Sequence, residues 1–325
     1  MKQTTRRRFV GGLAAATCAA VALPVRGAEV TRTTFTYKTV GDLQIKLDVH
    51  RPEGNATLPL MVWIHGGALI NGHREGVSGR VLKMAMDEGY ALASIDYRLA
   101  PETQLPKIIE DLEDAFRWLH KNSLEKFSAS SDKIAVAGGS AGGYLTLACG
   151  YRVKPRPTVL VAFYGYGDLI GPWYSTPSPH ARHHRSTMTE AEAFAQVDGP
   201  AISDSRDRQG NGGAFYQFCR QTGRWPAEVS GWDPHRQPRK FYPYMPVKNV
   251  DRHYPPTVLI HGTNDTDVPY EQSEWMARQL DRHGVEFQFT SIAGGEHGLG
   301  GGDPAAIDKA YVDAMAFVNK QMGQS

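Results

Sequence analysis

The sequence is poor in cysteine. Three cysteines occur among 325 residues, at positions 18, 149 and 219. This number excludes a disulfide-rich scaffold, in which several bridges take the place of a large core. Cys149 and Cys219 permit one bridge if the protein is exported. Spacing alone does not establish a disulfide, so we favour two buried free thiols.

Acidic residues are missing from the start of the chain, where the first is Glu29. Three arginines precede Phe9, and an apolar segment rich in alanine follows at residues 10–23. This order is typical of a signal peptide, and adjacent arginines before a phenylalanine resemble the twin-arginine export signal. We therefore expect residues 1–28 to be a signal peptide and the protein to be periplasmic or secreted. The alternatives are a disordered tail or an uncleaved anchor, although the apolar segment is short for a membrane span.

A basic surface for nucleic acid is also missing. The whole chain has a formal charge of +2, but residues 1–27 contain five basic residues and no acidic one, so their removal leaves −3. No basic stripe remains that would bind nucleic acid. His180, His183 and His184 lie close together in the sequence, but no carboxylate or cysteine nearby completes a metal site. We expect neither a metal ion nor another cofactor.

Short apolar runs alternate with segments of helical spacing through most of the chain. The expected strands are residues 33–38, 43–50, 58–64, 90–95, 133–137, 158–163, 257–260 and 285–292. The expected helices are residues 76–88, 105–121, 141–151, 271–282 and 304–322. Buried strands that alternate with helices predict an α/β fold with a mostly parallel, twisted sheet and helices on both faces. The first two strands, joined by a turn at Gly41 and Asp42, should be antiparallel.

The alternation stops between residues 168 and 250. We interpret this segment as a cap or lid inserted into the domain of residues 29–325, because long excursions in compact folds are usually functional. It is rich in aromatic side chains, namely Trp173, Tyr174, Tyr216, Phe218, Trp225, Trp232, Phe241, Tyr242 and Tyr244. These residues would suit either a substrate pocket or a small core of the cap itself, and both interpretations stay open.

The strongest motif is G-x-S-x-G at residues 138–142, with Ser140 at its centre. It follows an expected strand and begins an expected helix, which is the context that a serine nucleophile of this type requires. Glycines allow the tight turn, and the start of the helix offers free N–H groups to a reacting carbonyl. A dinucleotide site is the alternative, but Ser140 stands where that fingerprint needs its second glycine.

A serine nucleophile needs a base and an acid that orients the base, and this motif predicts the chain order serine, acid, histidine. His297 follows the expected strand 285–292 and is our candidate for the general base. Asp265 follows the strand 257–260 and is our candidate for the acid that orients His297. Asp267 competes for that role, but Asp265 fits the loop spacing better.

Donors for an oxyanion are expected from backbone N–H groups. His65, Gly66 and Gly67 end an early strand, as in oxyanion loops of the H-G-G type. The N–H groups of Gly66, Gly67 and Ala141 are therefore the candidate oxyanion hole. We expect His65 and His261 to be structural.

These motifs together resemble bacterial α/β-hydrolase esterases and lipases of the hormone-sensitive-lipase-like and xylan- or feruloyl-esterase-like groups. The matching segments are residues 65–67, 96–102 and 138–143, together with His261, Gly262, Asp265, Val268, Pro269 and His297. Gly139 and Ala68 stand where the hormone-sensitive-lipase-like enzymes usually carry an acidic residue and a third glycine. Residues 268–270 are more similar to dienelactone-hydrolase or prolyl-oligopeptidase relatives.

The resemblance implies an α/β-hydrolase fold and a serine esterase that works through an acyl-enzyme without a cofactor. Its expected partner is a small-molecule ester, with an acylated sugar and an aryl ester as the two options for the substrate. One alternative is an exported peptidase of the prolyl-oligopeptidase type. The other is a binding protein that uses a hydrolase fold without catalysis, because fold and function can separate.

Overall fold

The computed structural model describes residues 29–324, so the expected signal peptide at residues 1–28 lies outside it. Cys149 and Cys219 are both buried, and neither forms a disulfide. Within residues 29–324, no helix is both long enough and apolar enough to cross a membrane.

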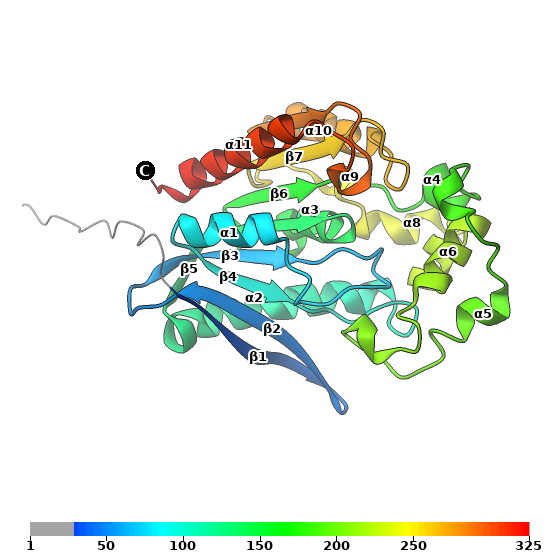
Figure 1. Cartoon of the computed structure of the whole chain (residues 1–325), viewed down its shortest axis with the longest axis horizontal. Coiled ribbons are helices and arrows are strands. Elements are labelled where there is room, and N and C mark those ends of the chain that lie inside the picture. Colours follow the sequence, from blue (N-terminus) through cyan, green and yellow to red (C-terminus); the bar gives the residue numbers. More distant parts are fainter. Residues whose placement is uncertain (1–28, 325) are drawn as a thin grey trace, which may run out of the picture.

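Eight strands form one open sheet in the order β1-β2-β4-β3-β5-β6-β7-β8 (Figure 1). Their bounds are β1 Val30–Val40, β2 Leu43–Pro52, β3 Leu58–Ile64, β4 Ala91–Ile95, β5 Ala129–Gly139, β6 Val159–Phe163, β7 Thr257–Gly262 and β8 Phe287–Ile292. The β1–β2 and β2–β4 pairs are antiparallel, and every other pair is parallel. The mostly parallel sheet with an antiparallel start is therefore confirmed.

Five helices pack against the sheet, of which four connect strands and the last follows β8. They are α1 Gly79–Asp87, α2 Leu105–Phe127, α3 Ala141–Arg152, α10 Glu271–Arg282 and α11 Pro304–Met322. Helix α1 begins three residues later than expected, because the side chain of Ser78 accepts a hydrogen bond from the N–H of Val81 and caps the helix there. Helix α2 runs six residues further than expected, to Phe127, and Ser128 caps it with a left-handed backbone.

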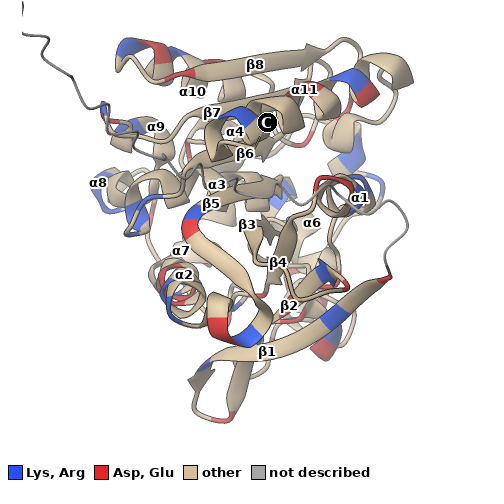
Figure 2. Ribbon diagram, turned by 90° about the vertical axis from the view of Figure 1, so that its left-hand side faces the viewer, with Lys and Arg blue, Asp and Glu red and all other residues tan. Residues whose placement is uncertain are grey.

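The helices cover both faces of the sheet, as Figures 1 and 2 show. Side chains of α2, α3 and α10 pack in the larger apolar core on one face, and side chains of α1 and α11 pack in a second core on the other. Strands β3 to β7 are therefore buried on both sides, which explains their continuous apolar sequences.

The segment between β6 and β7 contains short helices and no strand. Its elements are α4 Pro172–Ser175, η1 Ala181–His183, α5 Glu190–Phe194, η2 Ser205–Asp207, α6 Gly213–Thr222, α7 Trp225–Ser230, α8 Pro238–Phe241, η3 Tyr242–Tyr244, α9 Pro246–Asn249. Helices α4 to α6 lie beyond the carboxyl ends of the parallel strands (Figure 1). Helix α9 packs along α3. We call residues 168–250 the cap segment.

A buried ion pair joins the loop after β4 to α2. Both oxygens of Asp111 accept hydrogen bonds from the guanidinium of Arg98 at 2.7 Å, and one oxygen also accepts from Lys38 at 2.7 Å. The Asp111 side chain is fully buried. This carboxylate therefore fixes the start of the loop that carries Tyr97 beneath the site described below.

We expect Asp111→Ala to lower the free energy of unfolding by about 3–5 kcal/mol, because it leaves the buried charge of Arg98 uncompensated. Asp87→Ala is the matched control. It removes an exposed pair with Lys83 and should cost less than about 1 kcal/mol. Urea denaturation of both variants measures the difference. Equal losses would contradict the structural role of Asp111.

Candidate active site

Ser140 stands in a sharp turn between β5 and α3. Its φ and ψ are 57° and −122°, outside the usual range for a residue with a side chain. The Ser140 N–H donates to the Phe163 carbonyl at 3.0 Å, which holds the turn against β6. A side chain at Gly142 would overlap the carbonyl oxygen of Ile64, and one at Gly138 would overlap the carbonyl oxygen of Gly142. The glycines of the motif are therefore required by backbone contact.

The three residues expected to form a serine, histidine and acid set come together. His297 Nε2 lies 3.0 Å from Ser140 Oγ, and His297 Nδ1 lies 2.8 Å from Asp265 Oδ2. The other oxygen of Asp265 accepts from the N–H groups of Asp267 at 2.8 Å and Val268 at 2.9 Å. These backbone bonds fix the carboxylate, so that it presents one oxygen to the histidine.

The electrostatics of this set follow from burial and pairing. Burial alone would raise the pKa of Asp265, but hydrogen bonds from His261 and His297 outweigh it and lower the pKa to about 2. Burial alone would lower the pKa of His297, but the hydrogen bond to Asp265 and the charge of Asp267 raise it above its usual value. The arrangement thus stabilises the protonated ring of His297, the form that would arise if the ring took the hydroxyl proton of Ser140.

Gly66 lies against the turn of Ser140, because β3 pairs with β5 and Ile64 stands opposite Gly138. An added Cβ atom at Gly66 would be 2.8 Å from the Gly139 carbonyl oxygen and 3.2 Å from Ser140 Cβ. Gly67 follows with a left-handed φ of 110°. Ala141 is the first residue of α3, on the other side of Ser140. Of the expected oxyanion residues, Gly66 thus lies against the serine in space and Ala141 follows it in the chain, while Gly67 is the next residue of the loop.

The loop that carries Gly66 is anchored at both ends. The ring of His65 stacks on Tyr97 at 4.3 Å, and the Tyr97 hydroxyl donates to the His65 carbonyl at 3.0 Å. From the cap segment, Trp225 Nε1 donates to the Ala68 carbonyl at 2.9 Å. His261 is fully buried, with Nδ1 2.7 Å from the Ser273 hydroxyl and Nε2 3.3 Å from Asp265 Oδ2. A structural role for His65 and His261 stays a prediction.

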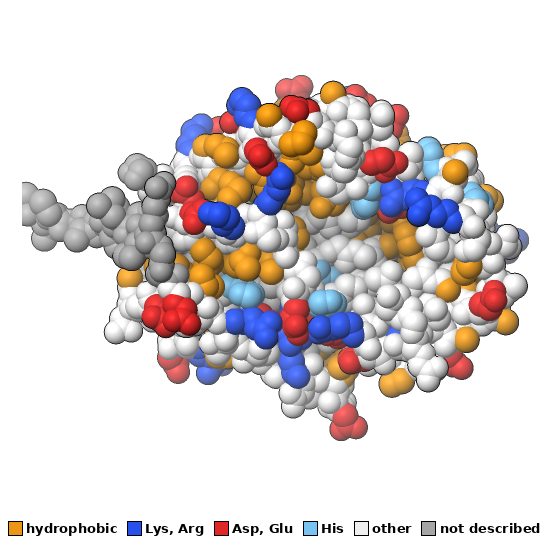
Figure 3. All heavy atoms as spheres, in the orientation of Figure 1, with side chains coloured by type: hydrophobic (Ala, Val, Ile, Leu, Met, Phe, Trp, Pro, Cys, Tyr) orange, Lys and Arg blue, Asp and Glu red, His pale blue; other side chains and the backbone are white. Residues whose placement is uncertain are grey.

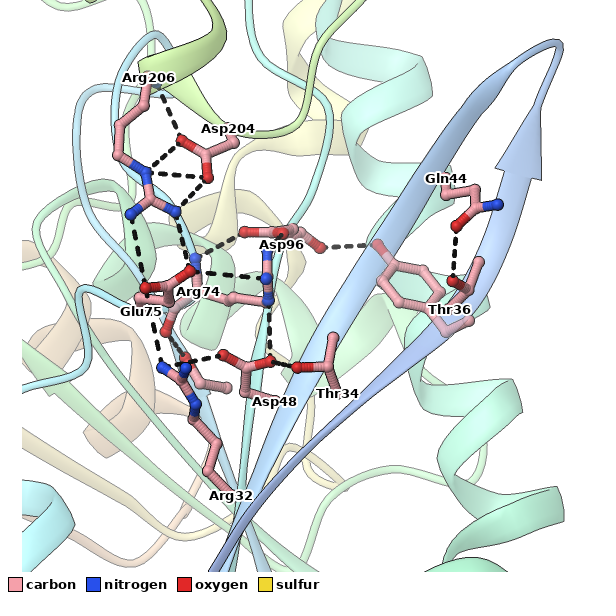
Figure 4. Close-up of polar contacts among 12 residues, drawn as sticks. Arg32, Thr34, Thr36, Gln44, Asp48, Arg74, Glu75, Asp96, Asp204 and Arg206 are labelled. Carbon is pink, nitrogen blue, oxygen red and sulfur yellow. Dashed lines mark hydrogen bonds and ion pairs between the residues drawn. The ribbon is translucent and has the colours of Figure 1, made fainter.

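Arg74 and Glu75, which follow in the same connection between β3 and α1, join a network of charges, shown in Figure 4. Arg74 donates to Asp48 at 2.9 Å and to both oxygens of Asp96, at 2.6 Å from its N–H and 2.9 Å from its guanidinium. Burial raises the pKa of Asp96 to about 7, although Arg74 opposes this shift. Arg206 of the cap segment pairs with the neighbouring Glu75 at 2.9 Å. The network ties the loop after β3 to β2, to the loop after β4 and to the cap segment.

A cleft of about 550 Å³ opens over Ser140. Its lining includes three aromatic side chains that sequence reasoning missed, those of Trp63, Tyr164 and Tyr311, and also Arg80. Tyr164 follows the last residue of β6, and β6 pairs with β5, which ends just before Ser140. Its position at the end of a strand next to β5 was the sequence signal that could have placed it at the site. Figure 3, drawn in the orientation of Figure 1, shows a hollow near the middle of the visible surface.

A second cleft of about 630 Å³ lies on the other side of His297. It is lined by Arg182, His183, Arg185, Ser186, Gln217, Glu296 and His297. Most of these residues belong to the cap segment, so the cap contributes a wall of the site.

The aromatic residues of the cap segment favour the small-core interpretation. None of the nine lines the cleft over Ser140. The ring of Tyr174 stacks between those of Trp173 and Trp225, with centroid distances of 3.6 Å and 3.9 Å. Phe218 and Phe241 are buried. No group of three or more metal-ligating side chains was found among residues 29–324, and His183 faces Asp267 instead.

We expect Asp265→Asn to lower the pKa of His297 by about 1–3 units, because a neighbouring carboxylate stabilises the charged imidazole by that amount. The measurement is an NMR titration of the His297 ring, assigned by comparison with His297→Gln. An unchanged titration midpoint would contradict the contact between Nδ1 and Asp265.

Comparisons with known proteins show the family to which this chain belongs. The family model BD-FAE matches residues 47–280. Non-reducing polyketide synthase Preu3 of Preussia isomera is 25% identical over 331 residues, which cover 87% of this chain and 13% of the synthase. Esterase LipC of Mycobacterium tuberculosis is 29% identical over 236 residues, which cover 72% of this chain and 51% of LipC. The chain thus spans about half of LipC and about an eighth of the synthase.

A solved structure shows the same fold. The alpha/beta hydrolase superfamily protein from Enterococcus faecalis superposes with a TM-score of 0.70 at 20% identity, covering 89% of this chain and 99% of that one. The fold is therefore that of the α/β-hydrolases. The BD-FAE family model matches well over half of the residues of this chain, so this chain belongs to the BD-FAE family.

Proposed function

We propose that this protein is a serine hydrolase that cleaves small carboxylic esters through an acyl-enzyme intermediate. The observation that carries the proposal is the continuous hydrogen-bonded line from Ser140 Oγ to His297 and on to Asp265, at 3.0 and 2.8 Å. A serine with a base in contact, and an acid that orients the base, is the arrangement that makes a hydroxyl nucleophilic.

The first half of the reaction makes the acyl-enzyme. Ser140 Oγ attacks the ester carbonyl while His297 Nε2 takes the hydroxyl proton. Asp265 keeps its negative charge and stabilises the protonated ring through Nδ1. When the tetrahedral intermediate collapses, His297 gives the proton to the leaving alcohol oxygen and the acyl group stays on Ser140.

The second half repeats these steps with water. His297 takes a proton from the water, the resulting hydroxide attacks the acyl carbon, and the proton returns to Ser140 Oγ as the acid departs. In both halves the N–H groups of Gly66, Gly67 and Ala141 would hold the carbonyl oxygen as it gains charge. A single donor of this kind is worth about 2.7–4 kcal/mol in other hydrolases.

The cleft over Ser140 supports an acyl group with a flat face. Trp63, Tyr164 and Tyr311 line it, and aromatic rings stack favourably on planar groups. This favours an aryl acyl group over a short alkyl one. The alcohol would lie on the His297 side, where the wall is polar and includes Gln217 and Arg182. An acylated sugar would suit that wall.

The two alternative functions receive less support. All eight strands of the described residues lie in one sheet, so that part of the chain holds no propeller of the prolyl-oligopeptidase kind. A binding protein without catalysis would have no need for the contact between Ser140 and His297. Cleavage of proline β-naphthylamide in excess of ester cleavage would favour a peptidase.

We expect Ser140→Ala to reduce ester turnover by about 10⁴-fold or more while the circular dichroism spectrum stays unchanged, because the nucleophile alone is removed. Rates on p-nitrophenyl acetate, butyrate and octanoate and on an ester of ferulic acid measure both the loss and the acyl preference. The ferulate ester should be the best substrate. Turnover that survives in Ser140→Ala would refute the proposed mechanism.

We further propose that the protein is exported and that residues 1–28 are removed. The support is the arginine pair, the apolar segment and the absence of acidic residues before Glu29. Mass spectrometry of the exported protein should find an N-terminus near residue 28. Replacing Arg6 and Arg7 by lysine should retain the protein in the cytoplasm, and export of that variant would contradict the twin-arginine route.

A further inference from the structure

A second carboxylate, Asp267, lies beside the proposed catalytic residues. It follows Asp265 by two positions in the loop after β7, and its side chain is about one-tenth exposed. It does not contact His297 Nδ1, where Asp265 is bound at 2.8 Å. Asp267 therefore does not replace the orienting acid, and its burial needs another explanation, because a buried carboxylate requires partners.

The partners of Asp267 come from the cap segment. The Tyr216 hydroxyl donates to its Oδ1 at 2.5 Å, and His183 Nε2 lies 3.3 Å from the same oxygen. Arg220, which is 3% exposed and packs over the ring of Tyr174, lies 3.9 Å away. These donors belong to η1 and α6, which are separate elements of the cap.

The other face of Asp267 turns toward the reacting atoms. Its Oδ2 lies 3.7 Å from His297 Nε2, the nitrogen that is also 3.0 Å from Ser140 Oγ. Arg182 of the cap is 3.7 Å from the same oxygen and pairs with Glu296 at 2.9 Å. One carboxylate thus contacts both the cap segment and the nitrogen that receives the proton of Ser140.

We propose that Asp267 is a positioning residue, which holds the cap segment over the site and places a negative charge beside the proton that His297 receives. This inference rests on the proposed function, because it assigns Asp267 a part in the same proton transfer. It also explains why the cap approaches the site with hydrogen-bond donors and cations.

The charges around both groups agree with this role. His297 faces Asp265 and Asp267 from one loop and Arg182 from the cap. The ring of Tyr164, the residue after β6, lies with its centroid 5.0 Å from that of His297. Burial would lower the pKa of His297, but the two carboxylates raise it. Burial would raise the pKa of Asp267, but the bond from His183 and the charges of His297 and Arg220 hold it well below its usual range.

The first test uses Asp267→Asn, which removes the charge and keeps the shape. We expect the NMR titration midpoint of His297 to fall by about one pH unit, since one of its two carboxylates is lost. Asp281→Asn, an exposed aspartate of α10, is the matched control and should leave the midpoint unchanged. No change in Asp267→Asn, or an equal change in the control, would overturn the proposal.

The second test uses Tyr216→Phe, which removes one cap donor and leaves the charge of Asp267 in place. Without the hydrogen bond from Tyr216, the negative charge of Asp267 is less compensated. It should therefore raise the NMR titration midpoint of His297, which is opposite to the effect of Asp267→Asn. The weaker hold on the cap should raise KM about fivefold, the loss expected from one hydrogen bond of about 1 kcal/mol. A midpoint that falls or stays constant in this variant would overturn the proposal, even if Asp267→Asn does not fold.

The titration does not depend on turnover, so the two proposals can fail separately. An unaltered midpoint in an active enzyme refutes the role of Asp267 alone. A wild-type protein with a raised His297 midpoint and no ester turnover refutes the proposed function and leaves the contact of Asp267 with His297 intact.

Discussion

The site depends on a close backbone contact between two loops at the carboxyl ends of β3 and β5. Gly66 packs against the Gly139 carbonyl, and Gly142 packs against the carbonyl of Ile64, with no space for a side chain at either glycine. This contact brings the loop after β3 to Ser140, whose backbone has a left-handed φ. The parallel pairing of β3 with β5 places both loops at one edge of the sheet, so the fold itself creates the contact.

Buried charges then fix what surrounds that contact. Asp111 holds the loop that carries Tyr97, and Arg74 joins the loop after β3 to Asp48 and Asp96. Asp265 and Asp267 stand on two sides of His297. Each of these carboxylates is buried and has a cationic or hydrogen-bonding partner from a different element. The charges therefore specify how separate parts of the chain meet, at the cost of desolvation.

Local patterns in the sequence were enough to predict the sheet, the turn at Ser140 and the order of Ser140, Asp265 and His297. Each of these follows from residues that are close together in the chain or from the position of a strand end. The walls of the cleft were not predictable in this way. Trp63 lies inside an apolar strand, and its sequence pattern indicates only a core position. The partners of Asp267 come from the cap segment, in which apolar residues do not recur at a regular spacing. Those contacts depend on tertiary packing, which no local pattern encodes.

Covalent labelling shows whether Ser140 is an activated nucleophile. A fluorophosphonate probe reacts with a serine only when a base and an oxyanion hole support the attack. Intact-mass spectrometry of the labelled protein should show one adduct per chain, peptide mapping should place it on Ser140, and Ser140→Ala should show none. No adduct on the wild-type protein, or an adduct on another residue, would contradict the account.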